Sequence, residues 1–534
     1  MTVANEAEKL TEFKNEALTD FSKDENRQAM LEALQKVRAG LGREHPLIID
    51  GKRITGLDTL ESINPSRKSE VLGRFQKGTR KHAEAAVEAA LRAFDRWKTQ
   101  PIDVRAGLLV KAADIMRRRK HEFSAVMILE VGKSFAEADA DTAEAIDFLE
   151  FYARDAYRLA GPQPIVKIEA EDNELVYLPL GVGAVIPPWN FPLAIMAGMT
   201  VAAVATGNTV VLKPSSDAPW IAWKFVELLE EAGMPAGVVN YVSGSGGEVG
   251  ETFIQHPKVR FIAFTGSKEV GLHINEEAAK TKKGQIWIKR VIAEMGGKDA
   301  IIVDSETDLN DAAGAVVASA FGFQGQKCSA CSRAIVDEAV YDQFVELVAE
   351  KTKQLIVGDV ENPQTNFGPV VNHSAFKKIR SYIEQGSREG RIVAGGNHDS
   401  SEGFFIDPTV IADVAPDAMI SQEEIFGPVL AITKSKNFDE SLRIANDTQY
   451  GLTGAVFTRN EEKLAKAREE FFVGNLYLNR KCTGALVGVH PFGGFNMSGT
   501  DSKAGGHDYL LLFLQAKVVS RKRIGVPPKD QQGF

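Results

Sequence analysis

From residue 180 onward, the chain alternates short apolar runs with longer segments of helical pattern. Residues 209–212, 238–242 and 259–264 have the length and composition of buried strands, and a second series starts at residues 300–303. Strands that alternate with helices indicate a parallel sheet covered by helices on both faces. The predicted fold class is therefore α/β. Since 534 residues exceed one ordinary core, we expect two units with a boundary near residue 295.

The remaining elements are predicted from local pattern. Charges interspersed among apolar residues indicate an amphipathic helical arm over residues 1–44, and a glycine turn indicates a hairpin over residues 47–54. Charged helical patterns follow over residues 82–160. Residues 165–170 alternate apolar and polar side chains, which predicts a half-exposed strand in an arm between subunits. The last strand candidate is 516–521.

One uncharged segment, residues 178–212, is long enough to cross a bilayer. Pro187, Pro188, Pro192 and Asn190 interrupt it, and glycine and alanine are common where a lipid-facing helix would carry leucine. A buried strand, a loop, a helix and a second strand explain the segment better. We therefore predict no membrane span.

Bulk charge and cysteine content narrow the function classes. A net charge of -9 and a pI near 5.7 leave no basic excess for a nucleic-acid backbone. Three cysteines do not make a disulfide framework, and the acidic N-terminal residues carry no targeting signal, so a cytoplasmic location is expected. Cys328 and Cys331 have the spacing of a metal or redox pair, but no further ligand group accompanies them, so no metal is predicted.

Three segments carry residues suited to catalysis. Cys328 follows Gly325-Gln326-Lys327, a setting that leaves a thiol open to a substrate on one side. Glu294 precedes Met295-Gly296-Gly297, which would let a general base move. Asn190 lies in a rigid apolar loop, IPPWNFP. A buried small hydrophobe remains the alternative interpretation of Cys328, and a surface acid that of Glu294.

Together, these segments resemble the NAD(P)-dependent aldehyde dehydrogenase superfamily from about residue 45 to residue 524. Within it, QGQKCSACSR, FTGSKEVG and GGFNMSGTDSKAGGHDYLLLFLQ look like the subfamily that oxidises glutamate semialdehyde to glutamate. The resemblance implies that Cys328 attacks the aldehyde and that Glu294 activates the water. It also implies that the Asn190 amide and the backbone N–H of Cys328 stabilise the oxyanion.

The resemblance further implies a Rossmann-type cofactor domain. After the strand ending at Phe264, a Gly-Ser turn leads into a helical segment, as a pyrophosphate site requires, although residues 244–250 form a rival glycine-rich loop. A plain strand-to-helix turn is the alternative for either loop. The implied cofactor-binding residues are Ile186, Pro187, Trp189, Lys213, Ser216, Gly246, Gly250, Thr265, Gly266, Ser267, Glu424 and Phe426.

Ser216 bears on the choice of cofactor. Many NAD-specific relatives carry a glutamate three positions after the lysine that matches Lys213, and this glutamate repels a 2′-phosphate. The chain has Ser216 there. We therefore predict NAD as the main cofactor, with measurable use of NADP.

The substrate-binding residues implied by the subfamily are Phe191, Ser329, Gly484, Ala485 and Phe492. Gly484, Ala485 and Ser329 would hold a carboxylate, while the two phenylalanines line the aliphatic chain. A dehydrogenase for another semialdehyde, such as succinic or aminoadipic, would share every catalytic residue. A catalytically silent protein on the same scaffold is the alternative from a different class.

The predicted domains follow the family pattern. The family pattern also implies a homo-oligomer, which is either a dimer built by exchanging the arm or an assembly of such dimers. A proline dehydrogenase is a candidate partner. The ranges are an N-terminal helical arm at 1–44, a cofactor-binding domain at 45–160 and 181–294, an oligomerisation arm at 161–180 and 505–524, a catalytic domain at 295–504 and a C-terminal tail at 525–534.

Overall fold

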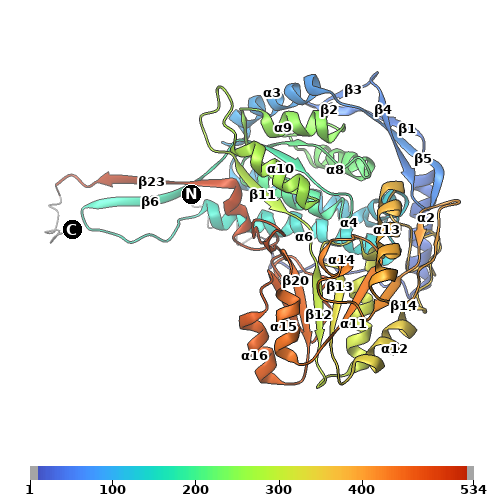
Figure 1. Cartoon of the computed structure of the whole chain (residues 1–534). Coiled ribbons are helices and arrows are strands. Elements are labelled where there is room, and N and C mark those ends of the chain that lie inside the picture. The colour runs from blue at the N-terminus through green and yellow to red at the C-terminus, as the bar shows by residue number, and fades with distance from the viewer. Residues whose placement is uncertain (1–9, 526–534) are drawn as a thin grey trace.

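The structure, a computed structural model, describes residues 10–525. Parts of the predicted N-terminal arm and C-terminal tail, residues 1–9 and 526–534, lie outside the described residues. Two seven-stranded sheets dominate the fold, and a two-stranded arm projects from the body (Figure 1). The cofactor unit and the catalytic unit are each built around one of these sheets.

The sheet of the cofactor unit has the order β11-β10-β7-β8-β9-β2-β3. Its first five strands are parallel, and the predicted hairpin forms the antiparallel edge. The bounds are β2 (Leu47–Ile49), β3 (Lys52–Ile54), β7 (Val182–Ile186), β8 (Thr209–Leu212), β9 (Val239–Tyr241), β10 (Val259–Thr265) and β11 (Arg290–Glu294).

Helices cover both faces of this sheet, as the alternation predicts. One apolar cluster joins the sheet to α3 (Arg80–Trp97), α9 (Glu251–Gln255) and α10 (Lys268–Ala279). A larger cluster lies on the other face. It includes α4 (Ile102–Arg118), α5 (Lys120–Val131), α6 (Phe135–Ala160), α7 (Ala194–Ala205) and α8 (Pro219–Ala232).

The uncharged segment at 178–212 forms β7, α7 and β8, so the predicted strand, loop, helix and second strand are confirmed. The α7 helix is buried along almost its whole length, which explains its apolar composition without a bilayer. Among the described residues, none of the helices combines the length and apolarity needed to span a membrane.

The catalytic unit contains a second sheet, ordered β14-β17-β18-β13-β12-β20-β21, in which only β14 is antiparallel. Its strands are β12 (Asp299–Val303), β13 (Cys331–Asp337), β14 (Arg391–Ala394), β17 (Thr409–Ala412), β18 (Val429–Ser435), β20 (Thr453–Phe457) and β21 (Asn475–Leu478). Its helices are α11 (Leu309–Phe321), α12 (Tyr341–Thr352), α13 (His373–Glu389), α14 (Met419–Gln422), α15 (Phe438–Asn446) and α16 (Glu461–Glu470).

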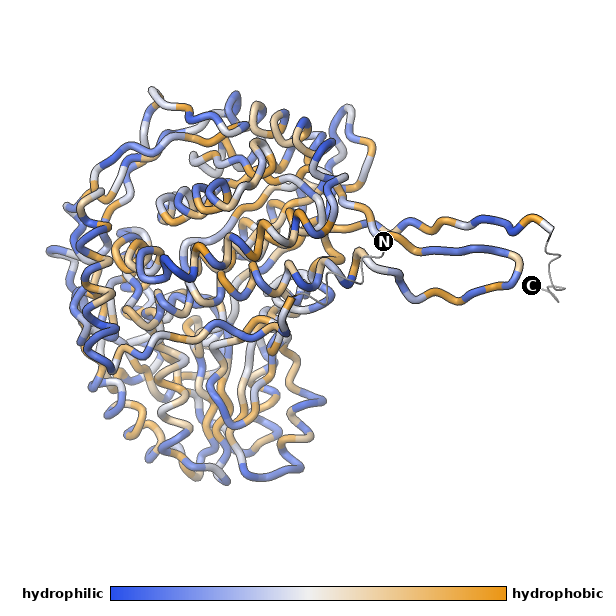
Figure 2. The backbone as a smooth tube through the Cα atoms, turned by 180° about the vertical axis from the view of Figure 1, so that it is seen from behind, coloured by the Kyte–Doolittle hydropathy of each residue, from blue (hydrophilic) through white to orange (hydrophobic). Residues whose placement is uncertain are grey.

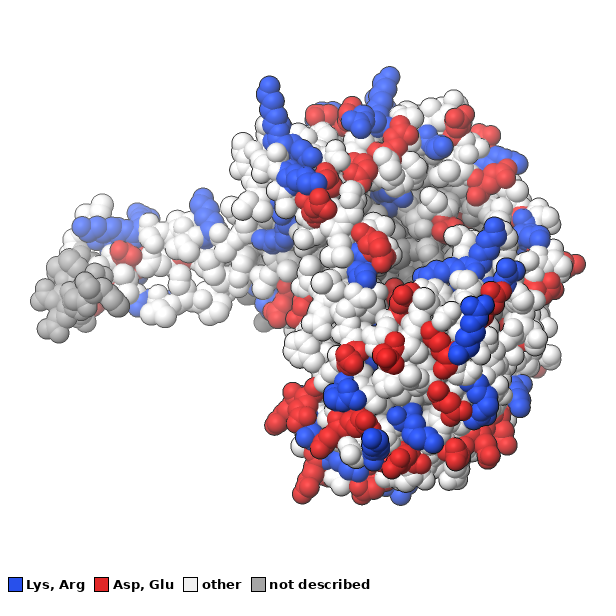
Figure 3. All heavy atoms as spheres, viewed as in Figure 1, with Lys and Arg blue, Asp and Glu red and all other residues white. Residues whose placement is uncertain are grey.

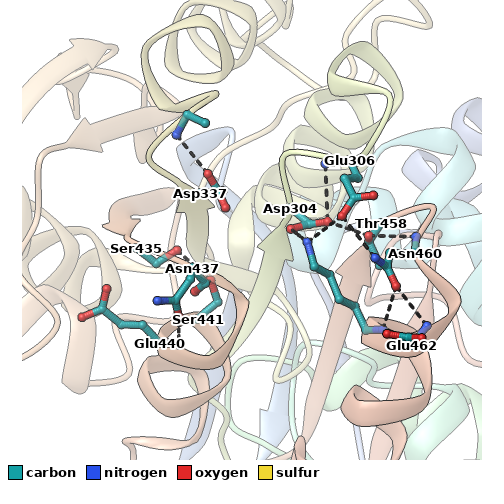
Figure 4. A network of polar contacts seen from close by, with 12 residues as sticks. Asp304, Glu306, Asp337, Ser435, Asn437, Glu440, Ser441, Thr458, Asn460 and Glu462 are labelled. Carbon is teal, nitrogen blue, oxygen red and sulfur yellow. Dashed lines mark hydrogen bonds and ion pairs between the residues drawn. The ribbon is translucent and has the colours of Figure 1, made fainter.

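A polar network closes the carboxyl edge of the catalytic sheet (Figure 4). Asp304, just after β12, accepts hydrogen bonds from Thr458 Oγ1 at 2.6 Å and from Lys463 Nζ at 2.7 Å. Asn460 caps α16 by accepting from two backbone N–H groups. These side chains satisfy one another's hydrogen-bonding groups and the first N–H groups of α16, so the network stabilises the fold at this edge. The residues predicted to act in catalysis lie at the opposite, amino edge of the sheet.

The N-terminal segment is helical over a shorter range than predicted. The helix α2 covers Asp24–Arg38, and residues 11–20 form no regular element. Backbone N–H groups of this segment donate instead to buried carboxylates of α6, Glu16 to Asp147 at 2.7 Å and Thr19 to Asp139 at 2.8 Å. A small sheet of β1 (Arg43–His45), β5 (Arg67–Gln76) and β4 (Thr59–Asn64) follows.

The arm consists of β6 (Glu171–Pro179) and β23 (Leu514–Lys522), paired antiparallel. Figure 2 shows apolar and polar residues mixed along it. The predicted strand at 516–521 lies inside β23. The strand predicted at 165–170 is wrong, because β23 ends at Lys522, opposite Glu171, and no strand pairs with the residues before Glu171.

The last part of the chain returns to the cofactor unit. Phe513 O accepts from Asn208 Nδ2 at 2.9 Å, and Arg290 Nη1 donates to Leu512 O at 2.6 Å and to Leu514 O at 3.0 Å. The carbonyl groups of Leu512 and Phe513 belong to the short helix η3 (Tyr509–Phe513), and that of Leu514 belongs to the first residue of β23. The arm is thus fixed to the cofactor sheet by side chains from β11 and from the turn before β8.

Candidate active site

The predicted site residues gather where two sheet edges meet. Ile186, Thr265 and Glu294 are the last residues of β7, β10 and β11, and Lys213 follows β8, so all four lie at one carboxyl edge. Cys328 and Glu424 instead precede β13 and β18, at the amino edge of the other sheet. Trp189 and Phe426 join the two edges with ring centroids 5.5 Å apart. Figure 3 shows the molecule hollowed between the two units.

The nucleophile loop, residues 325–329, leaves α11 through three consecutive left-handed residues. Phe323, Gln324 and Gly325 have φ values of 48°, 56° and 67°. A Cβ at Gly325 would lie 2.3 Å from Gly427 O, so only glycine fits there. Strained backbone of this kind persists where the surroundings fix it. The turn leaves Cys328 partly exposed, although Cys331 and Cys482 are buried.

The surroundings of Cys328 favour its thiol form over the thiolate. Burial raises its pKa above the ordinary value, and the carboxylates of Asp299, Glu424 and Glu294 add to the shift. The backbone N–H of Ser329 works in the opposite direction by stabilising the thiolate. A base must therefore remove the thiol proton before the sulfur can attack a carbonyl carbon.

Two donors for an oxyanion lie beside the sulfur. Asn190 is buried, and one N–H of its amide donates to Gln326 O at 3.1 Å. This bond leaves the second N–H of the amide for a substrate oxygen. The backbone N–H of Cys328 donates to no group among the described residues. The Asn190 amide is thus bound to the nucleophile loop two residues before Cys328, and its role as an oxyanion donor together with the Cys328 N–H stays a prediction.

Glu294 is held in a pocket made by residues 493–502. Its carboxylate accepts a short hydrogen bond from Ser502 Oγ and longer ones, both 3.3 Å, from the N–H groups of Gly494 and Ser502. Burial, opposed by these bonds, raises the pKa of Glu294 to about 7. A carboxyl group with this pKa can accept and return a proton near neutral pH.

The cofactor edge fits an anionic dinucleotide. The helices η1 (Gly246–Gly250) and α10 begin after β9 and β10, and their first N–H groups face the same edge. A Cβ at Gly246 would meet nothing within 4 Å, so a ligand can approach this backbone. Gly250 instead packs against the side chain of Lys213. Ser267 caps α10, accepting from Val270 N at 3.4 Å, and Gly266 precedes it.

Lys213 and Ser216 follow β8. Lys213 is buried with its Nζ 3.0 Å from Pro214 O, and burial lowers its pKa to about 8. Ser216 is exposed. On the facing edge, Glu424 Oε1 accepts from Gly297 N at 3.2 Å, and a Cβ at Gly296 would lie 2.1 Å from Glu424 Oε2, so any side chain there would displace this carboxylate. These residues can hold hydroxyl groups of a ribose.

The predicted substrate residues fall into two groups. Phe191 lies beside the nucleophile loop, with Lys327 Nζ 5.9 Å from its ring centroid. Ser329 O accepts from Cys482 Sγ at 3.4 Å, which brings residues 483–485 next to the nucleophile loop. Phe492 pairs with Ala504 and precedes the glycines around Glu294.

Sequence reasoning missed a set of charged residues beneath Phe191. Lys133 is fully buried, 3.0 Å from Asp141, and its Nζ lies 4.0 Å from the Phe191 ring centroid. Glu137 pairs with Lys327 at 2.7 Å. Lys327 stands in the cysteine motif and could have been noticed there. Lys133, Glu137 and Asp141 lie on α6 and just before it, where their pattern is that of an ordinary charged helix.

Comparison with known proteins agrees with this geometry. A model of the aldehyde dehydrogenase family matches residues 54–519. The chain belongs to the aldehyde dehydrogenase family. Its predicted α/β fold, with a cofactor unit and a catalytic unit, is the fold of solved members. The predicted superfamily resemblance is thereby confirmed.

Individual aldehyde dehydrogenase family members are similar over nearly the whole chain. A 1-pyrroline-5-carboxylate dehydrogenase of Geobacillus sp. (strain WCH70) is 61% identical over 95% of this chain and 99% of its own. The solved 1-pyrroline-5-carboxylate dehydrogenase from Thermus with bound NAD is 52% identical, with a TM-score of 0.95 over 96% of this chain and 100% of that one. Proline utilization A from Bdellovibrio bacteriovorus is 44% identical with a TM-score of 0.95, but only 54% of it is covered.

Proposed function

We propose that the chain oxidises L-glutamate 5-semialdehyde, the open form of 1-pyrroline-5-carboxylate, to L-glutamate. The observation that carries this proposal is the position of residues 483–485. Cys482, directly before them, donates to Ser329 O in the nucleophile loop at 3.4 Å, and the N–H groups of Gly484 and Ala485 have no partner within residues 10–525. This arrangement suits an aldehyde with a carboxylate at its far end. The similarity to enzymes named 1-pyrroline-5-carboxylate dehydrogenase supports the same substrate.

In the proposed mechanism, the Cys328 thiol releases its proton to solvent water, and the resulting thiolate attacks the aldehyde carbon. The Asn190 amide and the N–H of Cys328 then stabilise the oxyanion of the thiohemiacetal. NAD, if bound by the residues at the two edges, would supply the hydride acceptor that converts this adduct to a thioester. Glu294 takes a proton from water, which hydrolyses the resulting thioester and frees Cys328.

Glu294 must move to act on water at Cys328, because its carboxylate is bound in the pocket at 493–502. Gly296 and Gly297 follow it, and the strand ends at Glu294, so the side chain stands at the start of an irregular segment. We infer that the carboxylate leaves Ser502 once the thioester has formed.

The residues proposed to hold the cofactor are those gathered at the two edges. Lys213 would bind the adenosine ribose, the turn at Gly266 and Ser267 the pyrophosphate, and Glu424 the nicotinamide ribose, with Phe426 and Trp189 beside the ring. Ser216 supplies no negative charge against a 2′-phosphate. We therefore propose NAD as the main cofactor and NADP as a weaker one.

The arm supports an assembly of several copies. The pair β6 and β23 projects from the body, and Leu178 and Val518 on it are exposed. We propose that a second copy of the chain covers it, giving a dimer or an assembly of dimers. Three free cysteines fit a reducing cytoplasm. Because the chain matches 54% of proline utilization A, we also propose a proline dehydrogenase as the source of the substrate.

A cofactor-dependent assay over a panel of aldehydes tests the function. We expect kcat/KM to be highest for 1-pyrroline-5-carboxylate and lower for succinic semialdehyde, aminoadipic semialdehyde and propanal. A higher value for succinic or aminoadipic semialdehyde would reassign the substrate within the family. Absence of any turnover with NAD or NADP would instead favour the catalytically silent alternative.

A further inference from the structure

The anchor loop, which we define as residues 483–485, has two faces of opposite polarity. On one face, the carbonyl oxygens of Thr483 and Gly484 accept hydrogen bonds from Arg480 Nη2 at 3.0 and 3.2 Å. On the other face, the N–H groups of Gly484 and Ala485 donate to nothing within residues 10–525. One guanidinium group therefore binds two successive peptide units from the same side.

Peptide geometry links these two faces. In a trans peptide, the C=O of one residue and the N–H of the next point in opposite directions. The described residues contain no cis peptide bond. Arg480, by fixing the carbonyl of Thr483, therefore aims the N–H of Gly484 away from itself, and the carbonyl of Gly484 does the same for Ala485. A cation on the oxygen also polarises each peptide and strengthens its N–H as a donor.

Arg480 is itself fixed on two sides. Its guanidinium carbon lies 4.3 Å from the ring centroid of Tyr477, and its Nη1 lies 3.2 Å from His490 Nε2. His490 closes the far end of the loop, since its Nδ1 lies 3.2 Å from Leu486 N and its own N–H donates to Leu486 O at 2.8 Å. The group that holds the anchor loop is thus held by the residues that flank this loop.

The anchor loop also has a fixed distance to the nucleophile. Cys482, directly before it, donates from Sγ to Ser329 O at 3.4 Å, and Thr453 Oγ1 donates to the same oxygen at 3.4 Å. Both partners are buried. Ser329 follows Cys328, so a single hydrogen bond connects the residue next to the anchor loop with the residue next to the sulfur. This connection sets the length of substrate that can reach both.

We propose that Arg480 is a specificity-determining positioning residue, which orients the N–H groups of Gly484 and Ala485 toward the carboxylate end of a semialdehyde. The proposal rests on the function proposed above. Arg480 acts through the anchor loop and touches no substrate, so its replacement should weaken binding of a carboxylate-bearing aldehyde and leave other aldehydes unaffected.

The test compares two substrates in three variants. We expect Arg480→Gln to lower kcat/KM for glutamate semialdehyde by about 10- to 100-fold, mainly through KM, as loss of hydrogen bonds to a charged group predicts. For propanal, which has no carboxylate, kcat/KM of Arg480→Gln should equal that of the wild type. Arg480→Lys should recover part of the loss, since one ammonium group can bind one of the two carbonyls.

Lys481→Gln is the matched control. Lys481 is adjacent, carries the same charge and lines the same hollow of about 400 Å³. Its side chain lies against Gly484, but it makes no hydrogen bond to a carbonyl group of the anchor loop. It should leave KM for both substrates near the wild-type value. An equal loss in Lys481→Gln would mean that charge alone attracts the substrate, and would overturn the positioning role.

Other outcomes are equally decisive. Equal losses for propanal and glutamate semialdehyde in Arg480→Gln would mean a general disturbance of the site and would also overturn the proposal. Because Arg480 borders an open hollow, its shortening leaves no sealed cavity, and the melting temperature should stay close to that of the wild type. If the wild type prefers another carboxylate-bearing semialdehyde, the proposed function fails and the same comparison is made with that substrate. If no carboxylate-bearing aldehyde is preferred to propanal, both proposals fail.

Discussion

The two edges that form the site are built in different ways. At the cofactor edge, Ile186, Lys213 and Thr265 stand at or just after the ends of regular strands, where sheet hydrogen bonds fix the backbone. At the catalytic edge, Cys328 and the anchor loop lie in irregular segments held by single side chains such as Asn190, Cys482 and Arg480. Regular structure therefore holds a ligand common to many reactions, whereas irregular structure adapts to one substrate.

This difference predicts that substitutions at the two edges affect different properties of the enzyme. Changes at the cofactor edge should alter which dinucleotide binds, and changes at the catalytic edge should alter the chemistry or the aldehyde. Glu294 is the informative exception, because it ends a strand of the cofactor sheet while its carboxylate is bound by the catalytic unit.

The largest effect is expected from Cys328→Ala. Without the sulfur no covalent adduct forms, so dehydrogenase and esterase activities should both fall by at least ~10³-fold. Binding of NADH, measured by fluorescence, should be unchanged if the two edges act separately. Cys331→Ala, which removes a buried sulfur three residues away, should keep both activities. Wild-type dehydrogenase or esterase activity in Cys328→Ala would remove Cys328 from its role.

Glu294→Gln should slow thioester hydrolysis by about 10²- to 10⁴-fold, the usual contribution of a general base. We expect a rapid burst of one NADH per subunit, followed by slow turnover. The carboxylate is the active form and its pKa is about 7, so wild-type turnover should rise as pH increases through 7. This rise should be absent in the variant. Unchanged steady-state turnover would contradict the assignment.

Ionisation of Glu294 also links the site to stability. Its folded-state pKa lies above the ordinary value of 4.5, so its contribution to stability is present at low pH and is lost as pH rises through about 7. The melting temperature of Glu294→Gln minus that of the wild type should therefore be larger at pH 9 than at pH 5. Thermal melts at both pH values measure this, and a difference of the opposite sign would show that the buried carboxylate is favourably ionised.

Asn190→Ala should lower kcat by about 10²- to 10³-fold, since one oxyanion donor is lost. Asn190 comes from the cofactor unit but donates to Gln326 in the nucleophile loop, so this variant tests whether one side chain joins the two edges. NADH binding should be retained. A change in KM alone, with kcat preserved, would assign Asn190 to substrate binding and not to the oxyanion.

The smallest effect on activity is expected from Ser216→Glu. A carboxylate at this exposed position should repel a 2′-phosphate and lower kcat/KM with NADP by about tenfold, leaving the value with NAD within about twofold. The ratio of the two values measures cofactor choice directly. Equal losses with both cofactors would place the ribose elsewhere.

The cofactor edge was more predictable from the sequence than the catalytic edge. Strands such as 209–212 and 259–264 are continuous apolar runs, and residues at their ends follow directly from the parallel sheet. The surroundings of Cys328 depend on contacts between residues far apart in the chain, such as Cys482 with Ser329 and Lys133 with Phe191. No local pattern encodes these contacts. The strand expected at 165–170 failed for a similar reason, because strand formation requires a partner.

The path of the last residues has a consequence for synthesis of the protein. Asn208 and Arg290 belong to the cofactor unit, which precedes the catalytic unit in the chain, yet the carbonyl groups they bind belong to residues 512–514. The ribosome adds residues 512–514 only after the entire catalytic unit. Until translation is almost complete, Asn208 and Arg290 therefore lack these acceptor carbonyl groups. A nascent chain cut short by proteolysis or a premature stop would therefore expose an incomplete cofactor unit to the chaperones that recognise unfinished proteins.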